Sequence, residues 1–350
     1  MAGELLSRVG SEEQFFRASE GALSAMMGGG NRLFARDYRG ALLEKAKAEA
    51  DFVASSGICT VYYRDSGYPE RLSHCDDAPL MLYTLGNGDL NAGHWMSVVG
   101  TRHATPYGLG FVDNLISTIA DTVAQPVTIV SGLAFGIDIA AHKAAMKYGL
   151  PTVGVLAHGL NTIYPAQHRP VAADMVRSDG MLVTEYMSSA PIHKGNFVAR
   201  NRIVAGLCDC LVVAESAGKG GALITATLAS DYCRDVFALP GRVSDRFSEG
   251  CNRLIASNVA SLVQDPMQII EAMGWPTKES AIAPKQRTLF EELSEDERVV
   301  VDYLTERGEA MVNQMSVNLN INVGKLMSLL INMEFKGLVM NFPGGKYRLA

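Results

Sequence analysis

Short apolar runs recur between residues 96 and 238, and stretches of helical length separate them. The runs fall at residues 96–99, 127–130, 152–156, 181–183, 211–213 and 236–238. Strands that are apolar on both faces and alternate with helices are typical of a parallel sheet covered on both sides. The pattern therefore predicts an α/β domain with a doubly wound, mainly parallel sheet over residues 56–275.

The segments that flank this domain carry other patterns. Residues 1–55 read as a small helical module, with Ser11 at a helix start and Gln14 in the capping-box position. Residues 276–293 are polar, contain two prolines and predict a linker.

The C-terminal segment, residues 294–350, predicts three helices, the first capped by Ser294, and then a hairpin with a Gly-Gly pair. Three helices and a terminal hairpin suggest a winged helix, which is a variant of the helix-turn-helix. Its third helix has only Lys325 and Lys336 as nearby cations. We therefore favour a protein-binding or regulatory role for this unit over duplex DNA binding.

Composition excludes several classes of protein. No apolar run reaches the roughly 18 residues of a transmembrane helix, and no basic stretch precedes an apolar one at the N-terminus. We expect a cytoplasmic protein without membrane insertion. The six cysteines include no C-x-x-C pair, so we predict reduced thiols, no metal site and no cofactor.

Glycine-bearing loops follow five of the six predicted strands. They read GTRHATPYG, SGLAFGIDIAAHKAAM, AHGLNTIYPAQHR, AESAGKGGALITA and LPGRVSDRFSEGCN. The carboxyl ends of parallel strands meet at one sheet edge, and backbone N–H groups at glycine turns and helix starts bind anions. Five such loops predict phosphate recognition, although ordinary strand-to-helix turns remain the alternative.

Cations gather near these loops although the whole chain has a formal net charge of -6. The stretch HKGNFVARNRIVAGL, residues 193–207, contains no acid, and side-chain charge at the loops would come from Arg102, Arg200, Arg202 and Lys219. The alternative for some of these arginines is a structural ion pair with Glu185 or Glu215. Phe197 predicts either a stacking face for a base or plain core packing.

Two further local patterns predict how helices begin at these loops. Thr105 is placed to cap a helix whose first residue is Pro106, a favoured position for proline. His142 follows Asp138 by four residues, which is one helical turn. We expect a structural pair there, with a catalytic acid and base as the alternative.

The common nucleotide motifs are absent from these loops. Gly218-Lys219 is followed by Gly220 rather than by Ser or Thr, so the loop is not a Walker loop. Tyr107-Gly108-Leu109-Gly110 has Asp113 where a dinucleotide fingerprint needs a third glycine. The sheet is therefore not obviously that of a kinase, an ATPase or an NAD-binding domain.

The loops, in this order, resemble the DNA-processing protein A family (DprA, also called Smf). The matching stretches are VVGTRHATPYG, SGLAFGIDIAAHKAAM, GLNTIYPAQHR, FVARNRIVAGL, ESAGKGGALITATLA, DVFALPGRV and GCNRLI. The resemblance implies an extended Rossmann-like core that dimerises, in a cytosolic protein that binds single-stranded DNA. It also implies protection of incoming DNA and loading of the recombinase RecA onto it during natural transformation, without enzymatic activity.

The resemblance further implies roles for particular residues. Arg102 matches the arginine of the family's GSR motif and Lys219 the lysine of its KSG loop, both phosphate contacts. Arg200 and Arg202 match an RNR motif that lines the same pocket, and Asn252 would reach a base or sugar. The implied DNA-binding set is Gly100, Thr101, Arg102, Phe197, Arg200, Asn201, Arg202, Lys219, Gly220, Gly221 and Asn252.

The sequence departs from the family pattern at several positions. Thr101 replaces a Ser and keeps its hydroxyl, whereas Gly220 replaces a Ser and loses it. Val198 stands for a Pro and Asn258 for a Gly. The family's first module, which is SAM-like or helix-hairpin-helix-like, has one opening helix more than we expect in residues 1–55.

Two other functions compete with DNA binding. A nucleotide-binding enzyme of the phosphoribohydrolase-like group is the first, but such enzymes carry a Glu shortly after the Thr of their glycine loop. Here Thr225 is followed by Ala226 and Thr227. The second is a protein-interaction platform with a vestigial pocket. The resemblance also places a dimer surface on the last helix of the α/β domain, near residues 254–270.

Overall fold

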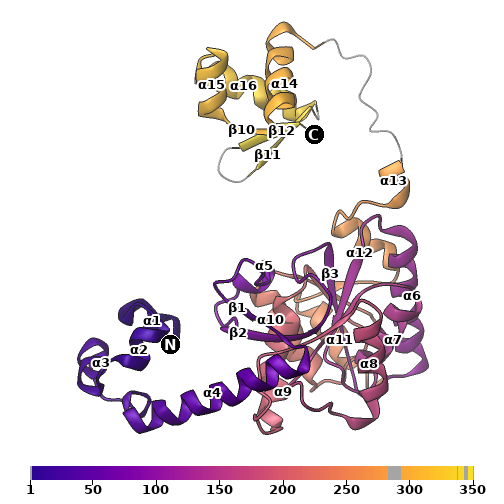
Figure 1. Cartoon of the computed structure of the whole chain (residues 1–350). Helices are drawn as coiled ribbons and strands as arrows, with labels where there is room; N and C mark the ends of the chain where they lie inside the picture. Colours follow the sequence, from indigo (N-terminus) through magenta and orange to yellow (C-terminus); the bar gives the residue numbers. More distant parts are fainter. Residues whose placement is uncertain (1, 283–292, 337, 343–345, 350) are drawn as a thin grey trace. The chain divides into compact units, whose positions relative to one another are not determined.

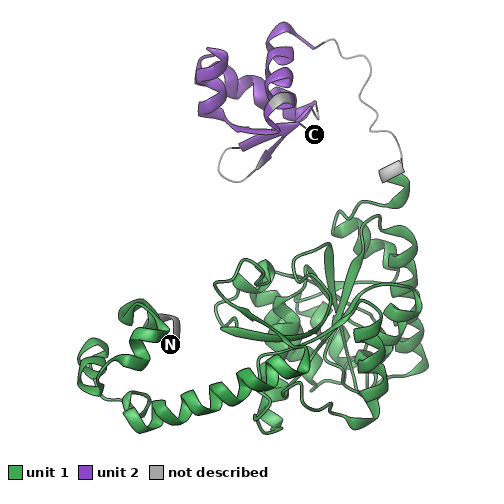
Figure 2. Ribbon diagram, in the orientation of Figure 1, with its two compact units in different colours: residues 1–282 green, residues 283–350 purple. Residues whose placement is uncertain are grey.

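The computed structural model describes residues 2–282, 293–336, 338–342 and 346–349 of the 350-residue chain. The chain divides into two compact units, residues 1–282 and residues 283–350 (Figure 2). The domain boundary that the sequence predicts after residue 55 falls inside the first unit. The subdivision into an N-terminal module and a sheet domain stays an interpretation.

A nine-stranded sheet forms the centre of the first unit, in the order β1-β2-β6-β5-β4-β3-β7-β8-β9. The strands are β1 (Cys59–Tyr62), β2 (Met81–Gly86), β3 (His94–Val99), β4 (Val127–Ser131), β5 (Thr152–Val155), β6 (Met181–Thr184), β7 (Cys210–Val213), β8 (Asp235–Ala238) and β9 (Ser261–Leu262). All strands from β3 to β9 pair in parallel, whereas β2 is antiparallel to both β1 and β6. The predicted doubly wound, mainly parallel sheet is confirmed, and the six predicted strands are β3 to β8.

Helices cover both faces of this sheet (Figure 1). They are α5 (Glu70–Ser73), α6 (Pro106–Thr122), α7 (Ile137–Lys147), the short η2 (Ala166–His168), α8 (Arg169–Arg177), α9 (Lys194–Gly206), α10 (Gly221–Asp231), α11 (Glu249–Ala256) and α12 (Pro266–Ala272). Along β7 the side chains alternate, because successive residues of a strand point to opposite faces. Val212 is buried in the core that α6, α7 and α12 share, and Val213 in the core that α9 and α10 share.

The sheet reverses its winding direction at β3. This strand lies between β4 and β7, so the chain proceeds from β3 toward one edge of the sheet and later returns to the other side of β3. The helix after β3, α6, covers one face, and the helix after β7, α10, covers the opposite face. The loops after β3 and β7 therefore lead to helices on opposite faces of the sheet, and a crevice opens at this point, at the carboxyl ends of the strands.

The segment expected to form one dimerising helix, residues 254–270, is not a single helix. It contains the end of α11, the edge strand β9 and the first part of α12. Asn258 has a φ of 55°, a left-handed conformation that asparagine tolerates, and the chain turns there from α11 into β9. The prediction of a continuous helix was wrong because this turn interrupts it.

The N-terminal part of the first unit consists of α1 (Ala2–Val9), α2 (Glu12–Arg17), α3 (Glu20–Met27), η1 (Arg32–Phe34) and α4 (Arg36–Ser56). The predicted cap is present, because Ser11 accepts a hydrogen bond from the backbone N of Gln14 at 3.2 Å. Toward the other end of α4, the buried Glu49 accepts hydrogen bonds from the backbone N and the hydroxyl of Ser188. This contact ties α4 to the loop after β6.

Within its described residues, the second unit has three helices and a three-stranded antiparallel sheet, in the order β10-β12-β11. Its elements are α14 (Glu295–Arg307), β10 (Glu309–Met311), α15 (Val312–Leu319), α16 (Val323–Phe335), β11 (Val339–Phe342) and β12 (Lys346–Leu349). Ser294 and Glu297 form the predicted capping box. The Gly344-Gly345 pair lies outside the described residues, and the winged-helix assignment stays a prediction.

The segment interpreted as a linker begins with a short helix, α13 (Lys278–Ile282). Within the part of the chain that the structure describes, no helix combines the length and the apolar character needed to cross a bilayer. No group of three or more His, Cys, Asp or Glu side chains among the same residues is arranged to hold a metal ion.

Candidate nucleic-acid interface

A cavity of about 640 Å³ lies at the carboxyl ends of β3 and β7, where the crevice opens. Its walls come from the loops after β3, β4, β5, β7 and β8, together with residues of α9 and α10. Nine of the eleven residues proposed from the sequence line it, namely Gly100, Thr101, Arg102, Phe197, Arg200, Asn201, Lys219, Gly220 and Gly221. Arg202 and Asn252 do not.

Backbone hydrogen bonds join the loops around the cavity. The N–H of Thr101 donates to the carbonyl of Glu215 at 2.7 Å, and the N–H of Ser216 donates to the carbonyl of Phe247 at 2.6 Å. The loops after β3, β7 and β8 are thus fixed to one another. Gly100 is required for this approach, because a Cβ there would lie 2.5 Å from Cγ1 of Ile137 and 2.9 Å from the Glu215 carbonyl oxygen.

The helix after β3 begins as predicted, with Thr105 as N-cap and Pro106 as the first helical residue. The hydroxyl of Thr105, however, does not cap the helix. It donates to Oε1 of Glu215 at 2.5 Å, and the Thr105 N–H donates to Oε2 at 2.8 Å. The buried Glu215 carboxylate therefore serves the loop rather than an arginine.

The charges around the cavity are mostly positive. Arg102, Lys194, Lys219 and Arg246 are exposed and line it, and none has an ion-pair partner within the described part of the chain. Asp138 is the single acid among the described lining residues. An acidic chain thus presents a local excess of positive charge, and the field of a cleft depends on such local groups rather than on the net charge.

Arg200 lies beneath the cavity and is only 4% exposed. Its Nη1 donates to the backbone oxygen of Val155, and a Cβ at Gly132 would come within 2.0 Å of the same nitrogen. Burial lowers the pKa of Arg200, and the nearby Asp138 carboxylate opposes this shift. The guanidinium supports the loop after β4 from below, whereas its contact with a phosphate stays a prediction.

Asp138 is also buried and completes the support of the same loop. Its Oδ2 accepts hydrogen bonds from the N–H of Gly132 at 3.1 Å and of Ala134 at 3.4 Å. Burial raises the pKa of Asp138, and the Arg200 charge counteracts the rise. Because Oδ2 of Asp138 already accepts two backbone hydrogen bonds, we assign Asp138 a structural role in stabilising the loop after β4.

The expected pair between Asp138 and His142 is wrong, since no hydrogen bond joins them. Nδ1 of His142 lies 2.7 Å from Oγ1 of Thr152, which itself donates to the carbonyl of Ile129. The Thr152 hydroxyl must therefore accept from His142, so Nδ1 carries the proton. Burial, together with the charges of Arg200 and His168, lowers the pKa of His142 to about 3.

Two proposed residues make contacts elsewhere. Arg202 donates to both oxygens of Glu185, as the ion-pair alternative predicted. Asn252 holds the loop after β8, because its Oδ1 accepts from the N–H of Gly241 and its Nδ2 donates to the carbonyl of the same residue. A DNA contact by either side chain stays a prediction.

Sequence reasoning missed several lining side chains. Lys194 is the first residue of α9 and belongs to the acid-free stretch 193–207, and Arg246 and Phe247 belong to the fifth glycine loop, so both signals were present. Tyr164 was not detectable by spacing. Its ring meets that of Phe197 edge to face, with centroids 5.5 Å apart, so Phe197 lines the cavity beside a second aromatic side chain.

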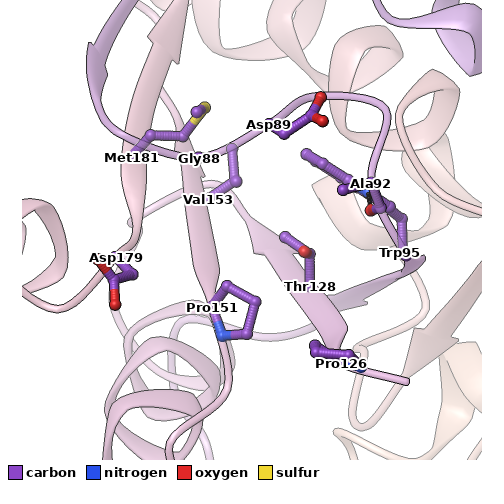
Figure 3. Close-up of a pocket in the computed structure, with 11 residues that line it drawn as sticks. Gly88, Asp89, Ala92, Trp95, Pro126, Thr128, Pro151, Val153, Asp179 and Met181 are labelled. Carbon is purple, nitrogen blue, oxygen red and sulfur yellow. Dashed lines mark hydrogen bonds between the residues drawn. The ribbon is translucent and has the colours of Figure 1, made fainter.

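A second cavity, of about 170 Å³, lies near the amino ends of the parallel strands (Figure 3). Trp95, Val153 and Met181 give it a mostly apolar wall, and Asp89 and Asp179 are its charged lining residues. No basic side chain lines it among the described residues. Its chemistry does not suit a phosphate, so the cavity at the carboxyl ends is the candidate interface.

The comparison with known families agrees with this geometry. The model of a family described as DNA recombination-mediator protein A matches residues 59–274. The chain belongs to this family. The match includes all nine strands of the sheet, so the resemblance seen in the loop motifs is confirmed and the core is Rossmann-like.

Relatives extend the match beyond the sheet. Protein Smf of Escherichia coli K12 is 35% identical over 297 residues, which cover 81% of this chain and 75% of that protein. DNA processing protein DprA of Streptococcus pneumoniae is 39% identical over 206 residues, covering 59% of this chain and 71% of its own.

Two solved structures of DNA processing protein A share this fold. The X-ray structure from Streptococcus pneumoniae matches with a TM-score of 0.66 at 33% identity and covers 77% of this chain and 91% of that one. The structure from Helicobacter pylori, which concerns the unique single-stranded DNA binding mode of that protein, matches with a TM-score of 0.55 at 28% identity. It covers 62% of this chain and 95% of the other.

Proposed function

We propose that this chain binds single-stranded DNA in the cavity at the carboxyl ends of β3 and β7 and acts as a recombination mediator. The observation that carries the proposal is the set of unpaired, exposed cations around the cavity, Arg102, Lys194, Lys219 and Arg246, beside glycine turns and helix starts of the kind that bind anions. The relative from Helicobacter pylori, studied for its single-stranded DNA binding mode, supports the choice of ligand.

Arg102 and Lys219 are the proposed direct phosphate contacts. Each follows a strand at the point where the winding reverses, and each is exposed without an acid partner in the described residues. Gly100, Gly220 and Gly221 would contribute backbone groups beside them, and Thr101 would contribute its hydroxyl.

A single strand fits this site better than a duplex. Exposed bases of a single strand stack on aromatic side chains, which a paired duplex cannot offer. Phe197 and Tyr164 lie at the cavity as an aromatic pair, close to the phosphate-binding loops. The stacking is independent of sequence, so we expect little base preference.

The proposed partners are those that the family resemblance implies. We propose that the protein works as a cytoplasmic homodimer, protects incoming DNA and loads RecA onto it during natural transformation. Asp138 is the single carboxylate among the described lining residues, and it already accepts hydrogen bonds from the loop after β4. This supports a binding role over nucleotide hydrolysis. Strand-exchange assays with RecA on DNA covered by a single-strand binding protein would test the loading step.

Fluorescence anisotropy with labelled oligo-dT over a salt series tests DNA binding. Each phosphate contact contributes about 0.7 to the slope of log K against log salt concentration. The variant Arg102→Ala with Lys219→Ala should bind weakly, with a slope shallower by about 1.4. Arg36→Ala with Lys45→Ala is the control of equal charge, since both cations are exposed on α4 and neither lines the cavity.

Two outcomes would contradict the proposal. If the wild-type protein does not bind oligo-dT at low salt, the cavity does not hold single-stranded DNA, and hydrolysis of nucleotides becomes the next assay. If the two double variants lose affinity equally, the charge of the whole protein rather than the cavity governs binding.

A further inference from the structure

Arg246 and Phe247, on the loop after β8, form a cation and an aromatic face beside the proposed phosphate site. The guanidinium carbon of Arg246 lies 5.7 Å from the centroid of the Phe247 ring. Both residues line the cavity, and Arg246 is exposed. The motif resemblance assigns neither residue a role.

The Phe247 ring is held in place by its own backbone and by a neighbouring ring. The carbonyl of Phe247 accepts the Ser216 N–H at 2.6 Å, which fixes it to the loop that carries Lys219. The imidazole of His103 lies 6.2 Å away between ring centroids, with the ring planes inclined by 28°. His103 follows Arg102 directly, so the aromatic pair connects the loops of both proposed phosphate contacts.

The charge of Arg246 is available to a ligand. Asp245 is the neighbouring acid, and it forms no ion pair with Arg246 in the described part of the chain. A cation that stacks on an aromatic ring keeps its N–H donors at the edge of the guanidinium. Those donors can bind a phosphate while the ring packs against a base.

From these contacts we infer that Arg246, Phe247 and His103 form a second nucleotide subsite for the nucleotide that adjoins the one bound by Arg102 and Lys219. Arg246 binds the phosphate, and the rings of Phe247 and His103 stack on the base. This inference rests on the proposed binding of single-stranded DNA. It makes the loop after β8, rather than Asn252 on α11, the part of this region that contacts the ligand.

The two kinds of contact predict different changes in oligo-dT binding. Arg246→Ala should make the slope of log K against log salt shallower by about 0.7, because one phosphate contact is lost. Phe247→Ala should weaken binding by about 5- to 150-fold and leave the slope unchanged, because stacking involves no counterion release. Both losses should appear only with oligonucleotides long enough to reach the second subsite.

Arg242→Ala is the matched control, because Arg242 is an exposed cation on the same loop that does not line the cavity. Phe247→Leu preserves an apolar side chain and should lose nearly as much affinity as Phe247→Ala. Thermal unfolding of each variant separates stacking from folding. Should a Phe247 variant unfold early, the exposed Arg246 still decides the question, since its removal leaves the core unchanged.

The inference is overturned if Arg246→Ala behaves like Arg242→Ala while Arg102→Ala with Lys219→Ala loses binding. That result would leave the proposed function intact and remove the subsite alone. Absence of binding by the wild-type protein would instead contradict both. An equal loss at every oligonucleotide length would also overturn the assignment to an adjoining nucleotide.

Discussion

Arg202 and Glu185 form a two-pronged ion pair, with Nη1 2.8 Å from Oε1 and Nη2 2.7 Å from Oε2. Both side chains are largely buried, at 17% and 19% exposed. The pair joins α9 to the residue that follows β6. The second arginine of the RNR stretch therefore holds two elements of the fold together, while the first, Arg200, supports the loop after β4.

Arg202→Ala should destabilise the protein without changing its phosphate contacts. Loss of hydrogen bonds between charged groups should lower the free energy of unfolding by about 1.5–3 kcal/mol, measured by urea denaturation. The salt slope of oligo-dT binding should stay that of the wild type. Glu185→Gln provides the complementary variant, and a slope shallower by about 0.7 for Arg202→Ala would show a DNA contact instead.

Gly100→Ala should damage both stability and DNA binding. The added Cβ would collide with Ile137 and with the Glu215 carbonyl oxygen, so the loops after β3 and β7 must separate. We expect a loss of about 1–3 kcal/mol in the free energy of unfolding and weaker oligo-dT binding. Gly110→Ala is the control, because no atom lies within 4 Å of its added Cβ and alanine favours the helix α6. Equal behaviour of the two variants would contradict the role of Gly100.

The buried strands could be predicted from the sequence because each presents an uninterrupted apolar run. The strands β1, β2 and β9 could not, since their residues are partly exposed and mix polar with apolar types. The loops of the site could also be predicted, because their glycines are recognisable in the local sequence. The positions of Phe197 and Lys219 at one cavity followed from the rule that carboxyl ends of parallel strands share an edge.

The hydrogen-bond and ion-pair partners of the site residues could not be predicted. Thr105 reads as an N-cap, but the fold brings Glu215 from a distant part of the chain to accept from its hydroxyl. Arg200 and Arg202 look alike in the sequence, yet one is buried under Gly132 and the other meets Glu185. Such contacts depend on how the chain reverses its winding direction at β3. The spacing of residues in one sequence does not reveal this.

His142 should make stability depend on pH. Burial, with the charges of Arg200 and His168, lowers its pKa from 6.5 to about 3, so the unfolded chain binds an additional proton between these values. Stability is then complete above the unfolded pKa and decreases as the pH falls below it. From about pH 7.5 to about pH 5 the loss due to His142 should be about 2 kcal/mol.

Urea denaturation of the wild type and of His142→Gln across this range isolates that contribution. The variant should lose about 2 kcal/mol less on acidification than the wild type. Other titrating groups affect both proteins alike, so the difference belongs to His142. Parallel pH profiles would mean that the imidazole is protonated in the folded state or exposed to solvent.

Leu262 gives a test of the proposed homodimer. It lies on β9, the edge strand of the nine-stranded sheet, and is 44% exposed, so an unpaired strand edge and an apolar side chain occur together. If this edge is the dimer surface, Leu262→Arg places a charge in the interface. The dissociation constant of the dimer should then rise by at least about tenfold, as measured by sedimentation velocity. Leu43→Arg, at an α4 position that is 40% exposed, is the control and should leave the dimer unchanged. A dimer that survives Leu262→Arg with its dissociation constant unaltered would place the contact on another surface of the chain.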